Sequence, residues 1–207
     1  MTDVTVAVRP ATPDDPAFEL LYLSAKPYYD AYAGSEQRAR ALVTTLYPRA
    51  GHAASFDVCA VAELDGALAG VLASFPVAES DARARRFVRL TAPRVPPWRW
   101  PALMRHLRAA ALLSPNPPPD TLYVDALAVD AQFRRRGVAR TLLARAEDAA
   151  GAAGYSGVSL DTGLHNDAAR ALYAAAGYEE REVRRAPTRA LAAAVGGPGF
   201  VSYVKRV

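Results

Sequence analysis

Residues 122–178 read LYVDALAV (122–129), DAQFRRRGVARTLLARAEDAAGAAGYS (130–156), GVSLD (157–161) and TGLHNDAARALYAAAGY (162–178). The two apolar runs have the length and composition of strands, and a segment with apolar residues at helical spacing follows each of them. The stretch therefore predicts strand, helix, strand and helix in succession. This order is typical of an α/β sheet.

The first of these helices opens with arginines and a glycine, Arg134-Arg135-Arg136-Gly137-Val138-Ala139. The first N–H groups of a helix have no partner within the helix, and the helix dipole favours negative charge there. A glycine lets the backbone approach a ligand closely, and arginines supply positive charge. The sequence therefore predicts a phosphate-binding turn over residues 134–141, although an ordinary strand-to-helix turn with solvated arginines has the same pattern.

Two motifs in this stretch resemble the acetyl-CoA site of the GCN5-related N-acetyltransferases, the GNAT family. The first is Arg or Gln, two residues, Gly, one residue, then Gly or Ala, and Arg134, Gly137 and Ala139 match it. A dinucleotide-binding turn fits less well, because one glycine does not make the G-x-G-x-x-G fingerprint. The second motif is more specific, and it is matched by Asn166, Ala169, Leu172, Tyr173, Gly177 and Tyr178.

The resemblance implies an α/β fold of the GNAT-type acyl-CoA N-acyltransferase class, with a mixed central sheet of about six to seven strands and helices on both faces. It also implies acetyl-CoA as the acetyl donor. Asn166 would lie beside the pantetheine arm, and it is also a candidate N-cap. The cofactor-binding residues implied are Leu127, Ala128, Val129, Arg134, Arg135, Arg136, Gly137, Val138, Ala139, Arg140, Thr141, Asn166, Ala169 and Tyr173.

Acetyl transfer to an amine needs a neutral amine, donors for the developing oxyanion and a proton for the departing sulfur. The resemblance makes Tyr173 the acid that protonates the sulfur. Asp125 is a candidate base or an anchor for a cationic amine, because a carboxylate within an apolar strand is costly unless it is paired. An arginine partner is the equally weighted alternative, and Glu63 is the reserve base. Strand alternation places Tyr123, Asp125, Leu127 and Val129 on one face of the sheet.

The function expected is an N-acetyltransferase that moves an acetyl group from acetyl-CoA to a primary amine by direct attack in a ternary complex. Cys59 has no partner that would indicate an acyl-enzyme route. The alternative is a sensor of the same fold that binds acyl-CoA without turnover. The acceptor stays open: a small amine, a polyamine, an amino acid, an antibiotic or a peptide terminus.

The rest of the chain fits one domain over residues 1–207. The patterns predict a strand over 4–8, helices over 14–32 and 35–47, a hairpin over 56–75 with an Asp-Gly turn, and strands to about 185 and over 200–207. Residues 79–120 form a proline-punctuated helical insert that we expect on the acceptor side. Tyr28, Tyr29, Tyr32, Trp98 and Trp100 could line an acceptor pocket, although such residues more often pack in a core.

Composition limits the other function classes. The net charge is +4 and the pI is about 9.4, but 23 of the 25 basic residues are arginines spread along the chain between acidic residues, which argues against nucleic-acid binding. No apolar run has the length of a membrane span, and no secretory leader opens the sequence, so we expect a cytoplasmic protein. His52, His106, His165 and Cys59 have no metal-ligand spacing. The last strand of such folds often supports a homodimer.

Overall fold

The computed structural model describes residues 6–207, whose strands form one sheet in the order β1-β2-β3-β4-β5-β7-β6. Neighbouring strands are antiparallel except β4 and β5, which are parallel. The expected mixed sheet of about six to seven strands is confirmed, with seven. The strands are β1 (Ala7–Pro10), β2 (Cys59–Leu64), β3 (Ala67–Pro76), β4 (Thr121–Val129), β5 (Gly157–Gly163), β6 (Glu179–Arg185) and β7 (Gly199–Arg206).

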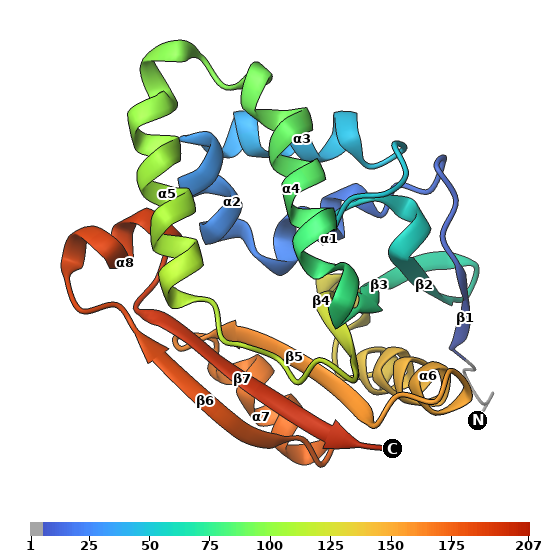
Figure 1. The fold of residues 1–207 in the computed structure, drawn as a ribbon. Coiled ribbons are helices and arrows are strands. Elements are labelled where there is room, and N and C mark those ends of the chain that lie inside the picture. Colours follow the sequence, from blue (N-terminus) through green and yellow to red (C-terminus); the bar gives the residue numbers. More distant parts are fainter. Residues whose placement is uncertain (1–5) are drawn as a thin grey trace.

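Helices cover both faces of the sheet (Figure 1). Helices α1–α5 bury one face in a core that includes Val71 and Ala126, and α6 and α7 bury the other in a core that includes Leu142 and Tyr173. The helices are α1 (Phe18–Ser24), α2 (Lys26–Ala33), α3 (Glu36–Leu46), α4 (Ser80–Thr91), α5 (Trp100–Leu113), α6 (Val138–Ala152), α7 (Asp167–Ala175) and α8 (Arg189–Val195).

The predicted helix over 14–32 is wrong as a single element. Helix α1 ends at Ser24, Ala25 leaves the helical conformation with φ −138° and ψ 38°, and α2 begins at Lys26. Pro27 explains the break, because its ring lacks an N–H and would clash with the carbonyl of the preceding turn. The break matters for the site, since it exposes the backbone of residues 24–25 towards the centre of the sheet.

Most other elements agree with the sequence, but two boundaries differ and one helix was not predicted. The first strand runs over Ala7–Pro10, and the part of its prediction before residue 6 lies outside the described residues. Residues 56–58 form a short 3-10 turn before β2. The alanine-rich residues 189–195, to which no element was assigned from the sequence, form the helix α8. The side chain of Thr188, just before this helix, accepts a hydrogen bond from the Leu191 N–H at 3.2 Å. That N-cap was the signal available in the sequence.

Helix α6 is fixed to the sheet by an apolar stripe, in which Leu142 is fully buried. Replacing Leu142 with alanine is expected to lower the free energy of unfolding by about 2–5 kcal/mol, because it leaves a cavity between helix and sheet. Leu112→Ala, at a position that is 55% exposed, should change it by less than about 0.5 kcal/mol. Urea titration of both variants would measure this, and equal losses would contradict the packing described.

Candidate active site

The parallel strands β4 and β5 separate at the centre of the sheet. They pair only through Thr121–Val124 and Gly157–Leu160, and beyond this point a cavity of about 340 Å³ lies between them. We call this cavity the central pocket. It is lined by Leu23, Ser24, Ala25, Pro27, Tyr28, Tyr29, Ser114, Tyr123, Val124, Asp125, Ala126, Leu127, Asp161, Thr162, Gly163, His165, Asn166, Ala169, Tyr173, Val195, Gly196, Gly197, Gly199 and Phe200.

A β-bulge lies at Asp125, where β4 meets the pocket. Ala73 pairs with Ala126 and the next residue of β3 pairs with Val124, so Asp125 is the extra residue. The strict alternation expected along this strand is therefore wrong: Tyr123 packs on the same side as Ala126, and Leu127 packs on the other. Bulges often redirect side chains beside functional sites, and here the bulge presents Asp125 to the pocket.

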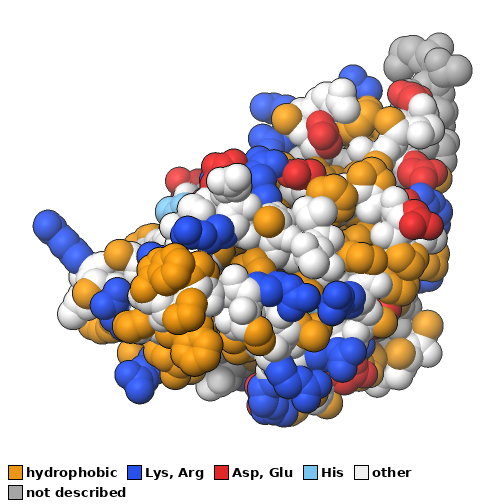
Figure 2. Space-filling model, turned by 90° about the horizontal axis from the view of Figure 1, so that it is seen from above, with side chains coloured by type: hydrophobic (Ala, Val, Ile, Leu, Met, Phe, Trp, Pro, Cys, Tyr) orange, Lys and Arg blue, Asp and Glu red, His pale blue; other side chains and the backbone are white. Residues whose placement is uncertain are grey.

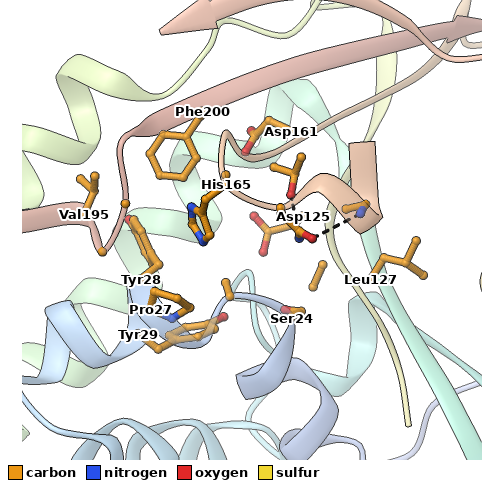
Figure 3. A pocket seen from close by; sticks show the side chains of 18 of the residues that line it. Ser24, Pro27, Tyr28, Tyr29, Asp125, Leu127, Asp161, His165, Val195 and Phe200 are labelled. Carbon is orange, nitrogen blue, oxygen red and sulfur yellow. Dashed lines mark hydrogen bonds between the residues drawn. The ribbon is translucent and has the colours of Figure 1, made fainter. Parts of the chain in front are cut away.

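The pocket holds two carboxylates, Asp125 and Asp161 (Figure 3). The Tyr123 hydroxyl donates a hydrogen bond to Asp161 at 2.6 Å, whereas Asp125 has no hydrogen-bond or ion-pair partner within residues 6–207. Desolvation by the surrounding protein, followed by the negative charge of Asp161, raises the pKa of Asp125 to about 7. The Asp125 side chain is nevertheless open to the pocket. Burial also raises the pKa of Asp161. The alternative for Asp125, an ion pair with an arginine, is absent from the described residues.

Tyr173 lies on α7 with its ring buried against Tyr178 and Tyr203, at centroid distances of 6.1 and 5.6 Å, and it lines the pocket. Burial, followed by the negative charge of Asp161, raises the pKa of the Tyr173 phenol. The hydroxyl is therefore protonated at neutral pH. A buried phenol beside a pocket has the chemistry of a proton donor.

Helix α7 is positioned by Asn166 at its N-terminus. The Asn166 side chain accepts a hydrogen bond from the Ala169 N–H at 3.2 Å and donates one to the Thr162 hydroxyl at 3.1 Å. The expected N-cap role is therefore present. Asn166 and Ala169 both line the pocket, so this cap lies where a ligand in the pocket would contact it.

The turn over residues 134–141, predicted from the sequence to bind phosphate, presents free backbone donors. The N–H groups of residues 135–140 have no hydrogen-bond partner within the described chain. Arg135 has φ 62° and Gly137 has φ 85°, a left-handed conformation that turns successive N–H groups towards one side. A Cβ placed on Gly137 would meet no protein atom within 4 Å. The geometry therefore leaves room for an anion against the backbone.

The side chains of this turn supply positive charge. Arg134, Arg135, Arg136 and Arg140 make no salt bridge with a carboxylate among residues 6–207. Two residues predicted to belong to the turn have a group that is not free for a ligand. The Thr141 N–H donates to the Gly137 carbonyl at 3.0 Å, and the Val138 side chain is buried in the core.

Glu63, the reserve base, does not line the central pocket. Its carboxylate accepts hydrogen bonds from Nε and Nη2 of Arg9, at 2.9 and 2.7 Å, near the edge strand β1. It is thus paired and remote from the carboxylates of the pocket. Of the two bases predicted from the sequence, Asp125 is the one that lines the pocket.

Of the five aromatic residues proposed for an acceptor pocket, only Tyr28 and Tyr29 line it. Tyr32 is buried and hydrogen-bonded to Thr91. Trp98 and Trp100 are 75% and 52% exposed, so they belong neither to the pocket nor to the core. Figure 2 looks down on the side of the molecule that carries α1–α5, and it shows Lys and Arg side chains spread among hydrophobic ones.

Sequence reasoning missed His165 and the loop between α8 and β7. His165 lies in the pocket near Asp125 (Figure 3). A Cβ on Gly197 would lie 2.9 Å from the His165 ring, so the glycine allows the loop to pack on that ring. The glycines of residues 196–199 were a visible signal, but nothing in the sequence placed them beside His165.

Within residues 6–207, no group of three His, Cys, Asp or Glu residues could hold a metal ion. No helix in this part of the chain is long and apolar enough to cross a membrane.

Comparison with known proteins gives one family and one fold. A model of the acetyltransferase (GNAT) family matches residues 18–178. An N-acetyltransferase from Staphylococcus aureus Mu50 has a TM-score of 0.71, with 16% identity over 96% of this chain and 100% of that chain. Another acetyltransferase structure has a TM-score of 0.66, with 20% identity over 97% and 99%.

A Bacillus subtilis acetyltransferase in complex with CoA has a TM-score of 0.54, with 13% identity over 99% of both chains. At these identities the likeness shows the fold alone, and the fold expected from the sequence is confirmed. No curated protein matches the chain in sequence.

Proposed function

Because this chain belongs to the acetyltransferase (GNAT) family, we propose that it moves an acetyl group from acetyl-CoA to a primary amine by direct attack within a ternary complex. That membership confirms two predictions from the sequence, the family and the acetyl-CoA-dependent acetyltransferase activity. The acceptor, the ternary complex and the role of each residue are our proposal. The observation that carries it is the central pocket, which has a proton donor and a pair of carboxylates where β4 and β5 separate.

The residues present fit the donor substrate. A diphosphate needs several N–H donors and cations, and the turn at residues 134–140 offers free N–H groups and unpaired arginines. The edge of β4 that faces β5 is unpaired from Asp125 onwards, so the backbone of Leu127 and Ala128 is available to hold the pantetheine amides. At Val129, the carbonyl already accepts a hydrogen bond from Arg134 Nε at 3.4 Å. Asn166 and Ala169 would lie beside the same arm. When bound, acetyl-CoA supplies the thioester that the amine attacks.

The acceptor end of the pocket is formed by the break between α1 and α2, the bulge at Asp125 and the loop before β7. The insert over residues 79–120 contributes Ser114 to the pocket lining. It supports the other lining residues of this end by packing behind them. His106 of α5 packs against Tyr28 at a centroid distance of 4.5 Å and donates from Nδ1 to the Ala194 carbonyl at 2.7 Å. We propose that the insert shapes the acceptor end through these contacts.

Two residues carry the proton transfers. Asp125 takes a proton from the incoming ammonium, since its raised pKa gives it a proton affinity suited to a base at neutral pH. Tyr173 holds a proton for the sulfur that leaves. Asp161, oriented by Tyr123, keeps a negative charge in the pocket. A sensor without turnover would need neither an acid nor a base, so the presence of both favours an enzyme. A homodimer stays a prediction.

Replacing Gly137 with valine is expected to weaken acetyl-CoA binding by at least about 100-fold. The new side chain would enter the open space against the turn and block two or more hydrogen bonds to phosphate, each contributing about 1.5 kcal/mol. Isothermal titration calorimetry with acetyl-CoA would measure the loss.

Gly154→Val provides the matched control for this variant. Gly154 follows the other end of α6, has φ 77°, and a Cβ on it would also meet nothing within 4 Å. Both variants should lose similar stability from a side chain in the left-handed region, but only Gly137→Val should lose affinity. Wild-type affinity in a folded Gly137→Val variant would refute this placement of the diphosphate.

A further inference from the structure

Among residues 6–207, the side chains with a formal charge that line the central pocket are carboxylates, and His165 is a further titratable group there. Asp125 and Asp161 are its charged residues, and no Lys or Arg lines it in a chain that has 25 of them. Lys26 lies beside lining residues, but its ammonium is bonded to Asp30 at 2.7 Å and to Glu36 at 2.6 Å, outside the pocket. A carboxylate in the acceptor would meet the charge of Asp161, and that of Asp125 whenever it is deprotonated, with no Lys or Arg as a partner, so the pocket disfavours amino acids.

Neither carboxylate is neutralised by the protein. Asp161 accepts one hydrogen bond, from Tyr123, and neither residue forms an ion pair within the described chain. Partly desolvated, unpaired carboxylates are costly and favour a ligand that brings compensating positive charge. The site therefore has places for two cationic groups, one beside each carboxylate.

The walls beside the carboxylates are aromatic. Tyr28 and Tyr29 come from α2 and Phe200 comes from β7, with centroid distances of 6.2 Å between the two tyrosines and 6.4 Å between Tyr28 and Phe200. Figure 3 shows these rings around one side of the pocket. Aromatic faces attract alkylammonium groups and pack against methylene chains.

The loop before β7 limits the size of the acceptor. A Cβ on Gly196 would lie 2.2 Å from the Pro27 carbonyl oxygen, so this loop packs directly on the start of α2 and closes that side. The whole cavity has about 340 Å³, part of which the acetyl end of the donor must occupy. The remaining space suits a compact molecule.

Resting on the proposed function, we propose that the acceptor is a compact alkyl diamine without a carboxylate: one nitrogen is acetylated and the second, as an ammonium, pairs with Asp161. The attacking nitrogen enters as an ammonium and passes a proton to Asp125. The C–N bond then forms and the C–S bond breaks. The nitrogen loses two protons overall. The proton taken by Asp125 is released to water, and the proton lost once the C–N bond has formed passes through solvent to Tyr173, where it replaces the one that Tyr173 gives to the sulfur. Once Asp125 is protonated, Asp161 is the remaining negative charge, which the second ammonium compensates.

Three amines of equal chain length test this proposal, because they differ only at the far end: putrescine has an ammonium, n-butylamine a methyl group and γ-aminobutyrate a carboxylate. The expected order of kcat/KM is putrescine, butylamine, γ-aminobutyrate. Putrescine should exceed butylamine by about tenfold or more, the value of a close charge pair. In the Asp161→Asn variant, the ratio of kcat/KM for putrescine to kcat/KM for butylamine should fall towards one.

Asp167→Asn is the matched control, since Asp167 follows Asn166 but is 92% exposed and lies outside the pocket lining. It should keep the wild-type ratio, which separates pairing with Asp161 from general attraction of cations. A wild-type ratio near one, preference for γ-aminobutyrate, or an unchanged ratio in Asp161→Asn would overturn the proposal.

Two further outcomes separate this inference from the function on which it rests. If the protein binds acetyl-CoA but acetylates a peptide terminus, or acetylates none of the three amines, the proposal of a diamine acceptor is refuted. The proposed acetyl-CoA site is not refuted by either result. Neither acetyl-CoA binding nor transfer to any amine would refute the proposed function itself.

Discussion

Replacing Tyr173 with phenylalanine is expected to slow acetyl transfer by about 10²–10⁴-fold, the usual contribution of a positioned general acid. The ring contacts with Tyr178 and Tyr203 would remain, so the fold and the affinity for acetyl-CoA should change little. The same burial that raises the pKa of this phenol also raises the proton affinity of a thiolate that leaves beside it. Single-turnover measurements would isolate the chemical step from product release.

Tyr178→Phe is the matched control for this prediction. Tyr178 is also buried and its ring packs against that of Tyr173, but it does not line the central pocket. The Tyr178→Phe variant, which lacks this hydroxyl, should have a single-turnover rate close to that of the wild type. A Tyr173→Phe variant with the wild-type rate would reduce Tyr173 to a packing residue.

Asp125→Asn is expected to lower kcat/KM by about 10²-fold or more, because it removes the proposed base and one of two charges that attract the ammonium. The pH profile gives the sharper test. A base works when it is deprotonated, so wild-type kcat/KM should rise as the pH passes the Asp125 pKa of about 7. That rise should be missing in Asp125→Asn.

The other titratable groups in the pocket are Asp161, His165 and the tyrosines, and they remain in both proteins, so the difference between the two profiles reports Asp125. Asp120→Asn, at an exposed position before β4, should keep the wild-type profile. If Asp125→Asn raises KM for the amine but keeps the pH dependence, Asp125 is an anchor and the proton leaves through water.

Sequence patterns predicted the elements wherever one local signal dominated. The Asp-Gly turn between β2 and β3, the Ser35 cap of α3 and the Asn166 cap of α7 are local interactions, and each is present. Helix α8 also has such a local signal, the Thr188 cap, although no helix was predicted there.

The site was predicted less completely, because its geometry depends on contacts between distant segments. The bulge at Asp125 arises from the register of β3 against β4, which periodicity along one strand cannot show. Gly197 lies against His165 and Gly196 lies against Pro27, and these contacts join segments that are distant in the sequence. The family motifs placed Tyr173 and Asn166, whereas the charge of the acceptor end became visible only when residues from α2, β4, β5 and β7 were brought together.

Direct acetyl transfer from acetyl-CoA to an amine in the central pocket is the reaction that we propose for this protein. Intact-mass spectrometry of the protein, combined with quantification of free CoA, tests it before and after an amine such as putrescine is added. With acetyl-CoA alone, we predict no acetylated protein and no release of CoA. Addition of the amine should then release CoA in equal amount to the N-acetylated amine. An acetylated protein that forms before the amine is added, or no CoA release with any amine, would contradict the account.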